Sequence, residues 1–247
     1  MRLTDDIHLV GGGPISGAGL TDGPDSHVYL LDGGDAVALV DCGLGSEDSV
    51  ARILRRVGEA NPGDSDRSLL LTHGHADHAG GAASMRSSGF RVHASAAVTA
   101  AIEPGDDEAT GTAAGRAAGI FPDDYRPTPV TVDRVVNDGE VLEVGRLRVT
   151  VIATPGHSAG HTAYLVEGPA GSALLSGDTL FLFGRILLQP VPDCDLVAHV
   201  ASLRRLGEHA FDALLPGHGG FVVEGGRGHL DMALGALDSL RIPPNLI

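Results

Sequence analysis

Apolar and polar positions alternate in several stretches of the chain, and these stretches predict β-strands. In residues 146–153, apolar side chains at positions 147, 149 and 151 alternate with polar ones, the pattern of a strand with one buried face. Residues 68–72 centre on a continuous apolar run, which is typical of a central strand covered on both faces. The pattern predicts further strands at residues 7–10, 27–31, 36–40, 90–93, 130–136, 140–144, 161–167, 173–176 and 211–215.

Helical spacing of apolar residues predicts helices between these strands. The first begins after Ser46, a good N-cap followed by acidic residues, and ends at the Asn-Pro-Gly of residues 61–63. Further helices are expected at residues 77–87, 195–206 and 227–240. Strand groups separated by helices indicate a mixed α/β fold. Because we detect no linker and no repeat, we expect one domain over residues 1–247.

Two segments are less regular than the rest. Residues 11–24 are rich in glycine, but their spacing fits neither a dinucleotide-binding motif nor a P-loop, so we expect a mobile loop. Residues 104–129 mix acidic, small and aromatic residues, which indicates an inserted, partly helical excursion. The insertion is either a solvated surface elaboration or a lid, and as a lid it offers Ile120, Phe121 and Tyr125 as candidate substrate contacts.

The charge and composition of the chain argue against several classes of function. A formal net charge of −15 predicts an acidic surface, which argues against nucleic acid as a partner because phosphate backbones need a basic footprint. All 17 basic residues are Arg, and without Lys the chain cannot form a Schiff base. Cys42 and Cys194 are too few for a disulfide framework. With no apolar run of about 18 residues and no signal-like N-terminus, we expect no membrane association and a cytoplasmic protein.

The strongest candidate for chemistry follows the apolar run at residues 69–71, where the chain reads Thr-His-Gly-His-Ala-Asp-His-Ala-Gly-Gly. In an extended segment, His73 and His75 point to the same face and can converge on one ion. If a helix begins near Asp77, its first turn presents Asp77 and His78 beside that ion. Imidazole and carboxylate ligands suit zinc, and iron or manganese are also possible.

This His-x-His-x-Asp-His segment resembles the signature of the metallo-β-lactamase superfamily, and three later segments resemble that family's other motifs in the same order. They are Thr-Pro-Gly-His-Ser-Ala-Gly-His at 154–161, Ser-Gly-Asp-Thr-Leu-Phe at 176–181 and Leu-Pro-Gly-His-Gly at 215–219. The resemblance implies a four-layer αββα sandwich, in which two mixed β-sheets are flanked by helices.

The resemblance also implies a dinuclear metal site. The first metal would be bound by His73, His75 and His157, the second by Asp77, His78 and His218, and Asp178 would bridge them. The expected cofactor is two zinc ions, with iron or manganese possible, and the nucleophile is a metal-bridging hydroxide. Asp77 is also the expected catalytic residue, because it lies close enough to this hydroxide to orient it and relay its proton.

Other residues near these motifs are expected to support the site. His161 lies four residues after His157 and matches no metal ligand of the family, so we expect it either to hydrogen-bond a ligand from behind or to be a polar residue at the start of the next strand. Asp41 follows a predicted strand and is a similar candidate, and Thr72 and Thr154 precede ligands and are expected to form outer hydrogen bonds. Phe181, three residues beyond the bridging position, is a candidate substrate contact.

The sequence differs from individual branches of the family at particular positions, and these differences reduce the number of reactions to be considered. Asp178, rather than Cys or Ser, disfavours a true β-lactamase, and His75, rather than Glu, disfavours a flavodiiron oxygen reductase. The acidic charge and the absence of a large insertion disfavour the RNA-processing members. The segment at 177–181 looks most like that of glyoxalase II. Because about 30 residues follow His218 and Lys is absent, we expect no C-terminal helical domain and no lysine anchor for glutathione.

The predicted function is therefore a dinuclear metal-dependent hydrolase of a small carbonyl substrate, either a thioester or a lactone or other ester. The main alternative is an oxidoreductase similar to the persulfide dioxygenases, which use one iron. A β-lactamase and a non-catalytic binding module are less favoured. The residues do not identify the substrate, the native metal or the oligomeric state.

Overall fold

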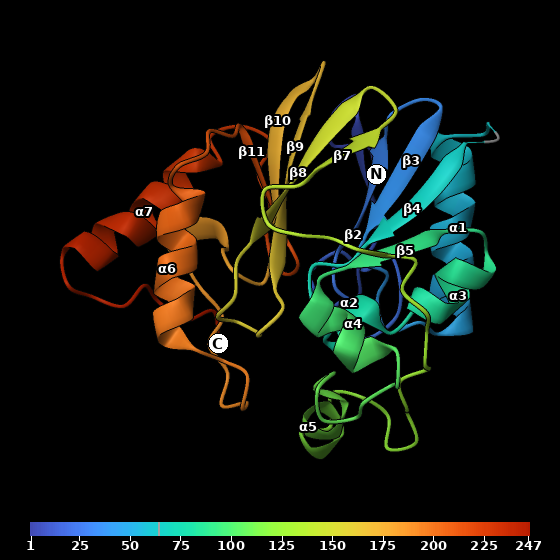
Figure 1. Cartoon of the computed structure of the whole chain (residues 1–247), viewed down its shortest axis with the longest axis horizontal. Helices are drawn as coiled ribbons and strands as arrows, with labels where there is room; N and C mark the ends of the chain where they lie inside the picture. Colours follow the sequence, from blue (N-terminus) through green and yellow to red (C-terminus); the bar gives the residue numbers. More distant parts are fainter. Residues whose placement is uncertain (64) are drawn as a thin grey trace.

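The computed structural model describes residues 1–63 and 65–247, whose strands form two mixed sheets of six and five strands (Figure 1). In the first sheet, β1 to β3 are antiparallel and β3 to β6 are parallel. In the second sheet, with the order β11-β10-β9-β8-β7, only the pair of β10 and β11 is parallel. The strands are β1 Ile7–Gly11, β2 Val28–Asp32, β3 Ala36–Val40, β4 Asp66–Leu70, β5 Arg91–Ala94, β6 Arg134–Val135, β7 Val141–Val144, β8 Leu147–Ala153, β9 Thr162–Gly168, β10 Gly171–Gly177 and β11 Ala213–Pro216.

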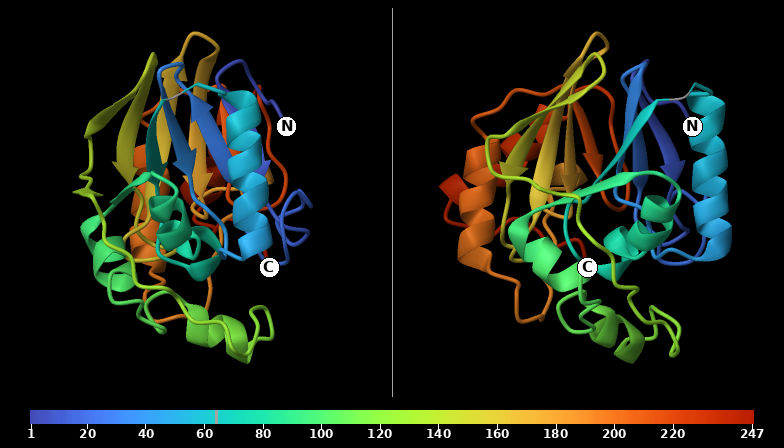
Figure 2. Two further views of the ribbon diagram at one scale, coloured as in Figure 1. Left: turned by 90° about the vertical axis from the view of Figure 1, so that its right-hand side faces the viewer. Right: turned by 45° about the vertical axis from the view of Figure 1, so that its right-hand side comes forward.

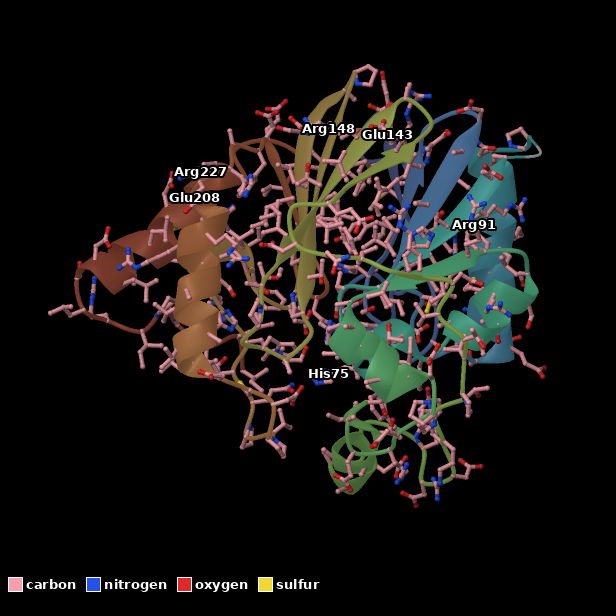
Figure 3. All side chains as sticks on the ribbon, viewed as in Figure 1. His75, Arg91, Glu143, Arg148, Glu208 and Arg227 are labelled. Carbon is pink, nitrogen blue, oxygen red and sulfur yellow. The ribbon has the colours of Figure 1, made fainter. Side chains whose placement is uncertain are left out.

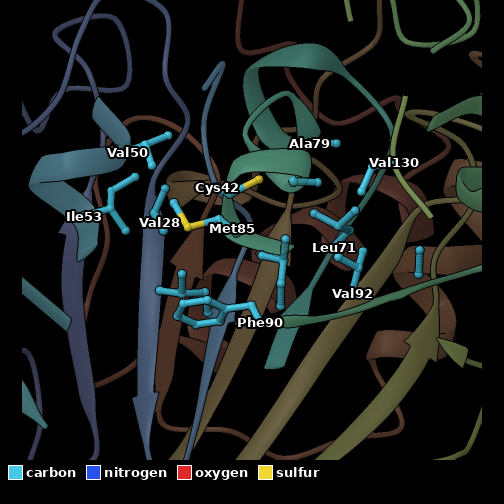
Figure 4. Close-up of a cluster of buried hydrophobic side chains, with 14 of the residues drawn as sticks. Val28, Cys42, Val50, Ile53, Leu71, Ala79, Met85, Phe90, Val92 and Val130 are labelled. Carbon is cyan, nitrogen blue, oxygen red and sulfur yellow. The ribbon is translucent and has the colours of Figure 1, made fainter. Parts of the chain in front are cut away.

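Helices cover the outer faces of both sheets, as Figures 1 and 2 show. Four helices, α1 Glu47–Ala60, α2 Ala76–Ala79, α3 Ala82–Ser87 and α4 Ala96–Ile102, contribute to a core against the first sheet (Figure 4). Two helices, α6 Leu196–Leu206 and α7 Arg227–Asp238, pack on the second sheet. A further core that includes Leu31, Val40, Val149 and Tyr164 lies between the sheets. The predicted four-layer arrangement is confirmed.

Helix α1 shows how the sequence specifies these layers. The Ser46 hydroxyl accepts a hydrogen bond from Ser49 N–H and caps the helix, and Glu47 and Asp48 lie at its positive end. Its buried residues recur at helical spacing and include Ile53, which is fully buried against the first sheet. A fully buried side chain of this size contributes about 2 kcal/mol of hydrophobic stabilisation.

Several predicted boundaries were wrong. The helix expected at 77–87 is two helices, α2 and α3, because a glycine pair interrupts it where the chain approaches Cys42. A Cβ at Gly81 would lie 2.6 Å from the carbonyl oxygen of Cys42. The strand expected at 130–136 is reduced to β6, since Asp133 binds β5 through its side chain as well as its backbone. Helix α4 was not predicted.

Residues 104–129 form turns around one short helix, α5 Thr112–Ala117, which lies at the lower end of the molecule in Figures 1 and 2. The segment contacts the start of helix α2, because the carbonyl of Thr110 accepts a hydrogen bond of 3.0 Å from Ala76 N–H. The partly helical excursion is thus observed, while its action as a lid and the one-domain organisation stay predictions. No helix in the described ranges is long and apolar enough to cross a membrane.

Candidate metal centre

Every predicted ligand follows the end of a strand, and these ends meet at one edge of the sandwich. His73 and His75 follow β4 and lead directly into α2, which carries Asp77 and His78. The second sheet contributes the other three, which lie just beyond β8, β10 and β11: His157, Asp178 and His218. Figure 3 shows His75 at this lower edge, between the two sheets. Rigid strands therefore fix the position of ligands that come from distant parts of the sequence.

The seven side chains form three overlapping groups whose potential ligand atoms lie within 4.8 Å of one another. These groups are His73, His75 and His157; His73, His78 and Asp178; and Asp77, His78 and His218. In the first group, Nδ1 of His75 is 3.1 Å from Nε2 of both His73 and His157. In the last group, the Nε2 atoms of His78 and His218 are 3.1 Å apart.

Asp178 lies between the first and last groups. Its Oδ2 is 3.7 Å from Nε2 of His157 and 3.6 Å from Nε2 of His218. Its Oδ1 is 3.5 Å from Nε2 of His78. One carboxylate thus faces nitrogen atoms of both groups, which is the position required of a bridging ligand.

Hydrogen bonds on the outer side of the rings orient three histidines. The Nδ1–H of His157 donates to the carbonyl of Leu187, and that of His78 donates to Oδ2 of Asp41. The Thr72 hydroxyl donates to the same oxygen of Asp41 and accepts from Nδ1–H of His73 at 3.0 Å. When each of these rings is neutral and carries its proton on Nδ1, the Nε2 lone pairs of His73, His78 and His157 all point inward.

These inward lone pairs fit a cation. Nitrogen lone pairs that face each other at 3.1 Å repel unless a proton or a metal ion lies between them. Asp178 Oδ1 is buried and has no hydrogen-bond partner among the described residues, although buried carboxylate oxygens are normally paired. Imidazole nitrogens with carboxylates are donors that zinc, iron and manganese accept. The residues present therefore fit divalent metal ions.

The carboxylates of the centre stay ionised. Burial opposes their charge, but His78 and His218 outweigh it and lower the pKa of Asp77 to about 2. The same two rings hold the pKa of Asp178 well below its usual range. Burial alone would lower the pKa of His78, yet nearby carboxylates, chiefly Asp178 and Asp41, raise it. The negative charge gathered here is what a pair of cations would compensate.

His161 holds the backbone of Asp178. Its Nε2 accepts a 3.0 Å hydrogen bond from Asp178 N–H, while its Nδ1 lies 2.8 Å from the hydroxyl of Thr154 and 3.0 Å from that of Thr179. Burial, followed by the charge of His157, lowers the pKa of His161 well below its usual value, so the ring is neutral. With both nitrogens engaged, the ring has no lone pair left for a metal ion.

Asp41 contacts the centre through three hydrogen bonds of 2.8 Å each. Its Oδ1 accepts from Thr72 N–H, and its Oδ2 accepts from the Thr72 hydroxyl and from His78. Its φ of 62° is left-handed, a conformation that non-glycine residues adopt at some cost and that often marks functional sites. Asp41 thereby fixes the ring of His78 from behind.

Sequence reasoning missed His199. It is fully buried on α6, and its Nε2–H donates to the carbonyl of Thr179 at 2.8 Å. Gly156, the neighbour of His157, packs closely on His199, and a Cβ at Gly156 would collide with the backbone of His199. The only sequence signal was its place on the buried face of α6, four residues before Leu203.

The candidate substrate contacts differ in exposure. Ile120 is 50% exposed, whereas Phe121 and Phe181 are 8% and 2% exposed. Phe121 packs on Leu44 and Ala76, and the Tyr125 hydroxyl donates to the carbonyl of Leu44. Contact of Phe121 or Phe181 with a substrate stays a prediction, and it requires these side chains to turn outward.

Both irregular segments border the partly exposed ligands. In the insertion, a Cβ at Gly111, whose φ is +65°, would lie 3.3 Å from Cδ2 of His75. In the glycine-rich loop, the carbonyl of Ser16 accepts a 2.8 Å hydrogen bond from Gly219 N–H, next to His218. The two segments therefore border different ligand groups, those of His75 and His218.

Comparison with known sequences agrees with this geometry. Residues 21–218 match the family described as the metallo-beta-lactamase superfamily. A hydroxyacylglutathione hydrolase of Dechloromonas aromatica is 34% identical over 157 residues, which are 64% of this chain and 44% of that protein. One from Cupriavidus taiwanensis is 32% identical over 163 residues, 65% of this chain and 51% of that protein. The chain thus spans about half the length of the curated relatives it matches.

Solved structures share the fold. A metallo-beta-lactamase of Cronobacter sakazakii, mutated in its HARLDQ motif, superposes with a TM-score of 0.70 at 22% sequence identity. The superposition covers 97% of this chain and 95% of that one. At this identity the likeness concerns the architecture alone. Because the family match runs from the glycine-rich loop to the last ligand, this chain belongs to the metallo-beta-lactamase superfamily.

Proposed function

We propose that this protein is a dinuclear metal-dependent hydrolase of a small carbonyl substrate, a thioester or a lactone or other ester. The observation that carries the proposal is the position of Asp178, whose carboxylate faces both groups of nitrogens and whose buried Oδ1 has no hydrogen-bond partner in the described part of the chain. In this proposal His73, His75 and His157 hold the first ion, and Asp77, His78 and His218 hold the second. Asp178 belongs to both.

A pair of divalent ions, when bound, would lower the pKa of water toward neutrality and polarise the substrate carbonyl. Asp77 is placed to orient the attacking water by accepting a hydrogen bond from it. Its carboxylate is partly exposed, with Oδ2 3.2 Å from Nε2 of His218. Since its pKa is about 2, it is ionised at neutral pH and can accept a hydrogen bond that orients the attacking water.

The name of the relatives favours a thioester. Hydroxyacylglutathione is an acyl thioester of a tripeptide thiol, and the relatives carry that name. This chain matches only about half of their length and contains no Lys, so a thioester of a different thiol and a lactone both remain within the proposal. In thioesters and lactones alike, the bond that breaks joins a carbonyl carbon to a sulfur or oxygen leaving group.

Metal content and a substrate panel test the proposal together. Protein purified without chelator should contain about two metal ions per chain. It should hydrolyse at least one class in a panel of glutathione thioesters, other acyl thioesters, lactones and simple esters, and chelation should abolish this activity until metal is restored. Asp178→Asn should lose metal and activity together. One iron per chain with oxygen uptake on persulfides, or no metal at all, would overturn the proposal.

A further inference from the structure

The loop that carries His218 is held by residues of the opposite sheet. His218 follows β11 in the second sheet, whereas His27 and Tyr29 lie at the start of β2 in the first. We propose that His27 is a positioning residue that, together with Tyr29, sets the place of His218 and thereby the affinity of the second metal position. The inference rests on the proposed dinuclear site and adds a residue that none of the family motifs contains.

Three hydrogen-bond contacts join these segments, and a fourth lies within the first-sheet segment. His27 N–H donates to the carbonyl of Gly217 at 2.8 Å. The Nδ1 of His27 lies 3.0 Å from the carbonyl oxygen of Pro216, and the Tyr29 hydroxyl donates to the same oxygen at 2.8 Å. The Tyr29 hydroxyl also lies 3.1 Å from Nδ1 of His27. Because a carbonyl only accepts, the contact with Pro216 requires the proton of His27 to be on Nδ1.

The ring of His27 cannot move freely within this arrangement. It is 1% exposed, and Tyr29 is 2% exposed. Phe221 meets the ring edge-to-face, with centroids 6.0 Å apart, and on another side a Cβ at Gly12 would lie 3.0 Å from its Cδ2. The packed ring and the backbone N–H of His27 therefore hold the two carbonyls that directly precede His218 in a fixed position relative to β2.

The second ligand group also depends on this segment through Asp77. The carbonyl of Asp77 accepts a 3.0 Å hydrogen bond from the N–H of Ser26, the residue before His27. Two neighbouring residues thus hold the backbone at both Asp77 and His218, whose side chains lie 3.2 Å apart. The first group contains neither of these ligands, since it comprises His73, His75 and His157. Metal ligands must be held within about 0.5 Å of their working geometry, so a loosened loop affects the second position selectively.

Matched variants separate the hydrogen bond from the bulk of the ring. In His27→Asn the side-chain amide nitrogen can occupy the place of Nδ1, whereas in His27→Gln it reaches the place of Nε2. Tyr29→Phe removes one hydroxyl and keeps the packing of the ring. The probe is Co²⁺: the full-length protein is dialysed against buffered Co²⁺ at rising concentrations, and its Co²⁺ content and visible absorption are measured, with circular dichroism as the check of folding.

The wild-type protein should bind two Co²⁺ ions per chain in this experiment. His27→Gln and Tyr29→Phe should weaken the second binding step by about 10- to 100-fold and leave the first within about 2-fold, and His27→Asn should restore the second step. Equal weakening of both steps, unchanged binding in His27→Gln and Tyr29→Phe, or an Asn variant as weak as the Gln variant would overturn the role of His27. A wild-type protein that binds one Co²⁺ would instead overturn the dinuclear site itself.

Discussion

Replacing Asp41 by Asn should destabilise the protein and remove one metal ion. The change is nearly isosteric, and Asn tolerates the left-handed backbone of φ 62° found here, so the effect reports on hydrogen bonding rather than on strain. Asp41 accepts three hydrogen bonds, two from Thr72 and one from His78. An amide can keep the bond from Thr72 N–H, but its NH₂ group then faces the N–H of His78.

The magnitude follows from the bonds that are lost. A hydrogen bond to a charged group contributes about 1.5–3 kcal/mol, and a rotated Thr72 hydroxyl can accept from the new amide, so one such bond is lost outright. We therefore expect the free energy of unfolding to fall by about 2–3 kcal/mol. His78 can relieve the conflict by moving its proton to Nε2, which leaves no lone pair directed at the centre. The metal content should then fall from about two ions per chain to about one.

Urea denaturation in the presence of a chelator measures the loss of stability, and elemental analysis of protein purified without chelator measures the metal. The matched control is Asp35→Asn, a change at an exposed Asp ahead of β3 that should alter the free energy of unfolding by at most about 0.5 kcal/mol. An Asp41→Asn protein that matches this control in stability and still holds two metal ions would refute the reasoning.

Three further changes test other contacts. Gly217→Ala should weaken binding of both ions at least about 10-fold in metal titrations, because its methyl group collides with Asp178 Oδ1, whereas Gly228→Ala, in open space on α7, should not. His161→Ala, purified with excess zinc, should retain a near-normal metal content by elemental analysis, and loss of one ion would make His161 a ligand. Burial, then Arg134 and Arg91, lower the pKa of His93 to about 4, so the folded state binds fewer protons than the unfolded state between about pH 4 and 6.5. Stability should therefore fall by about 1–2 kcal/mol from pH 7 to pH 5 in urea titrations, and His93→Leu should lack this part of the loss.

The apolar pattern predicted a mixed α/β fold and a group of metal-binding side chains at the end of one strand, whereas the four layers and the full set of seven ligands were expected from the resemblance to the family. Apolar runs that end in His or Asp mark the strand ends, and each such end lies on one edge of a sheet. The predicted helix at 77–87 failed because its break depends on a contact between Gly81 and Cys42, which residue spacing does not encode. Helix α4 was missed because its Ala-rich segment has little apolar periodicity, although Ser95 caps it by accepting from Val98 N–H.

The surroundings of the centre were harder to predict than the centre itself. A single histidine without partners at ligand spacing gives no signal in sequence, and His27 is such a residue. Its ring contacts Pro216, 189 positions away, and only the packing of one sheet on the other brings the two together. Asp41 could be predicted as a supporting residue from its place after a strand, but its contact with His78 depends on the fold.

The division of ligands between the sheets has a consequence for the order of events in synthesis. Each of the three ligand groups combines residues that precede β5 with at least one residue that follows β8. A nascent chain that has completed only the first sheet therefore has no complete group, and the last ligand emerges when β11 has been made. Each metal can be held only after segments of the two halves have docked, and a full complement of metal would mark a chain that has been made as far as His218.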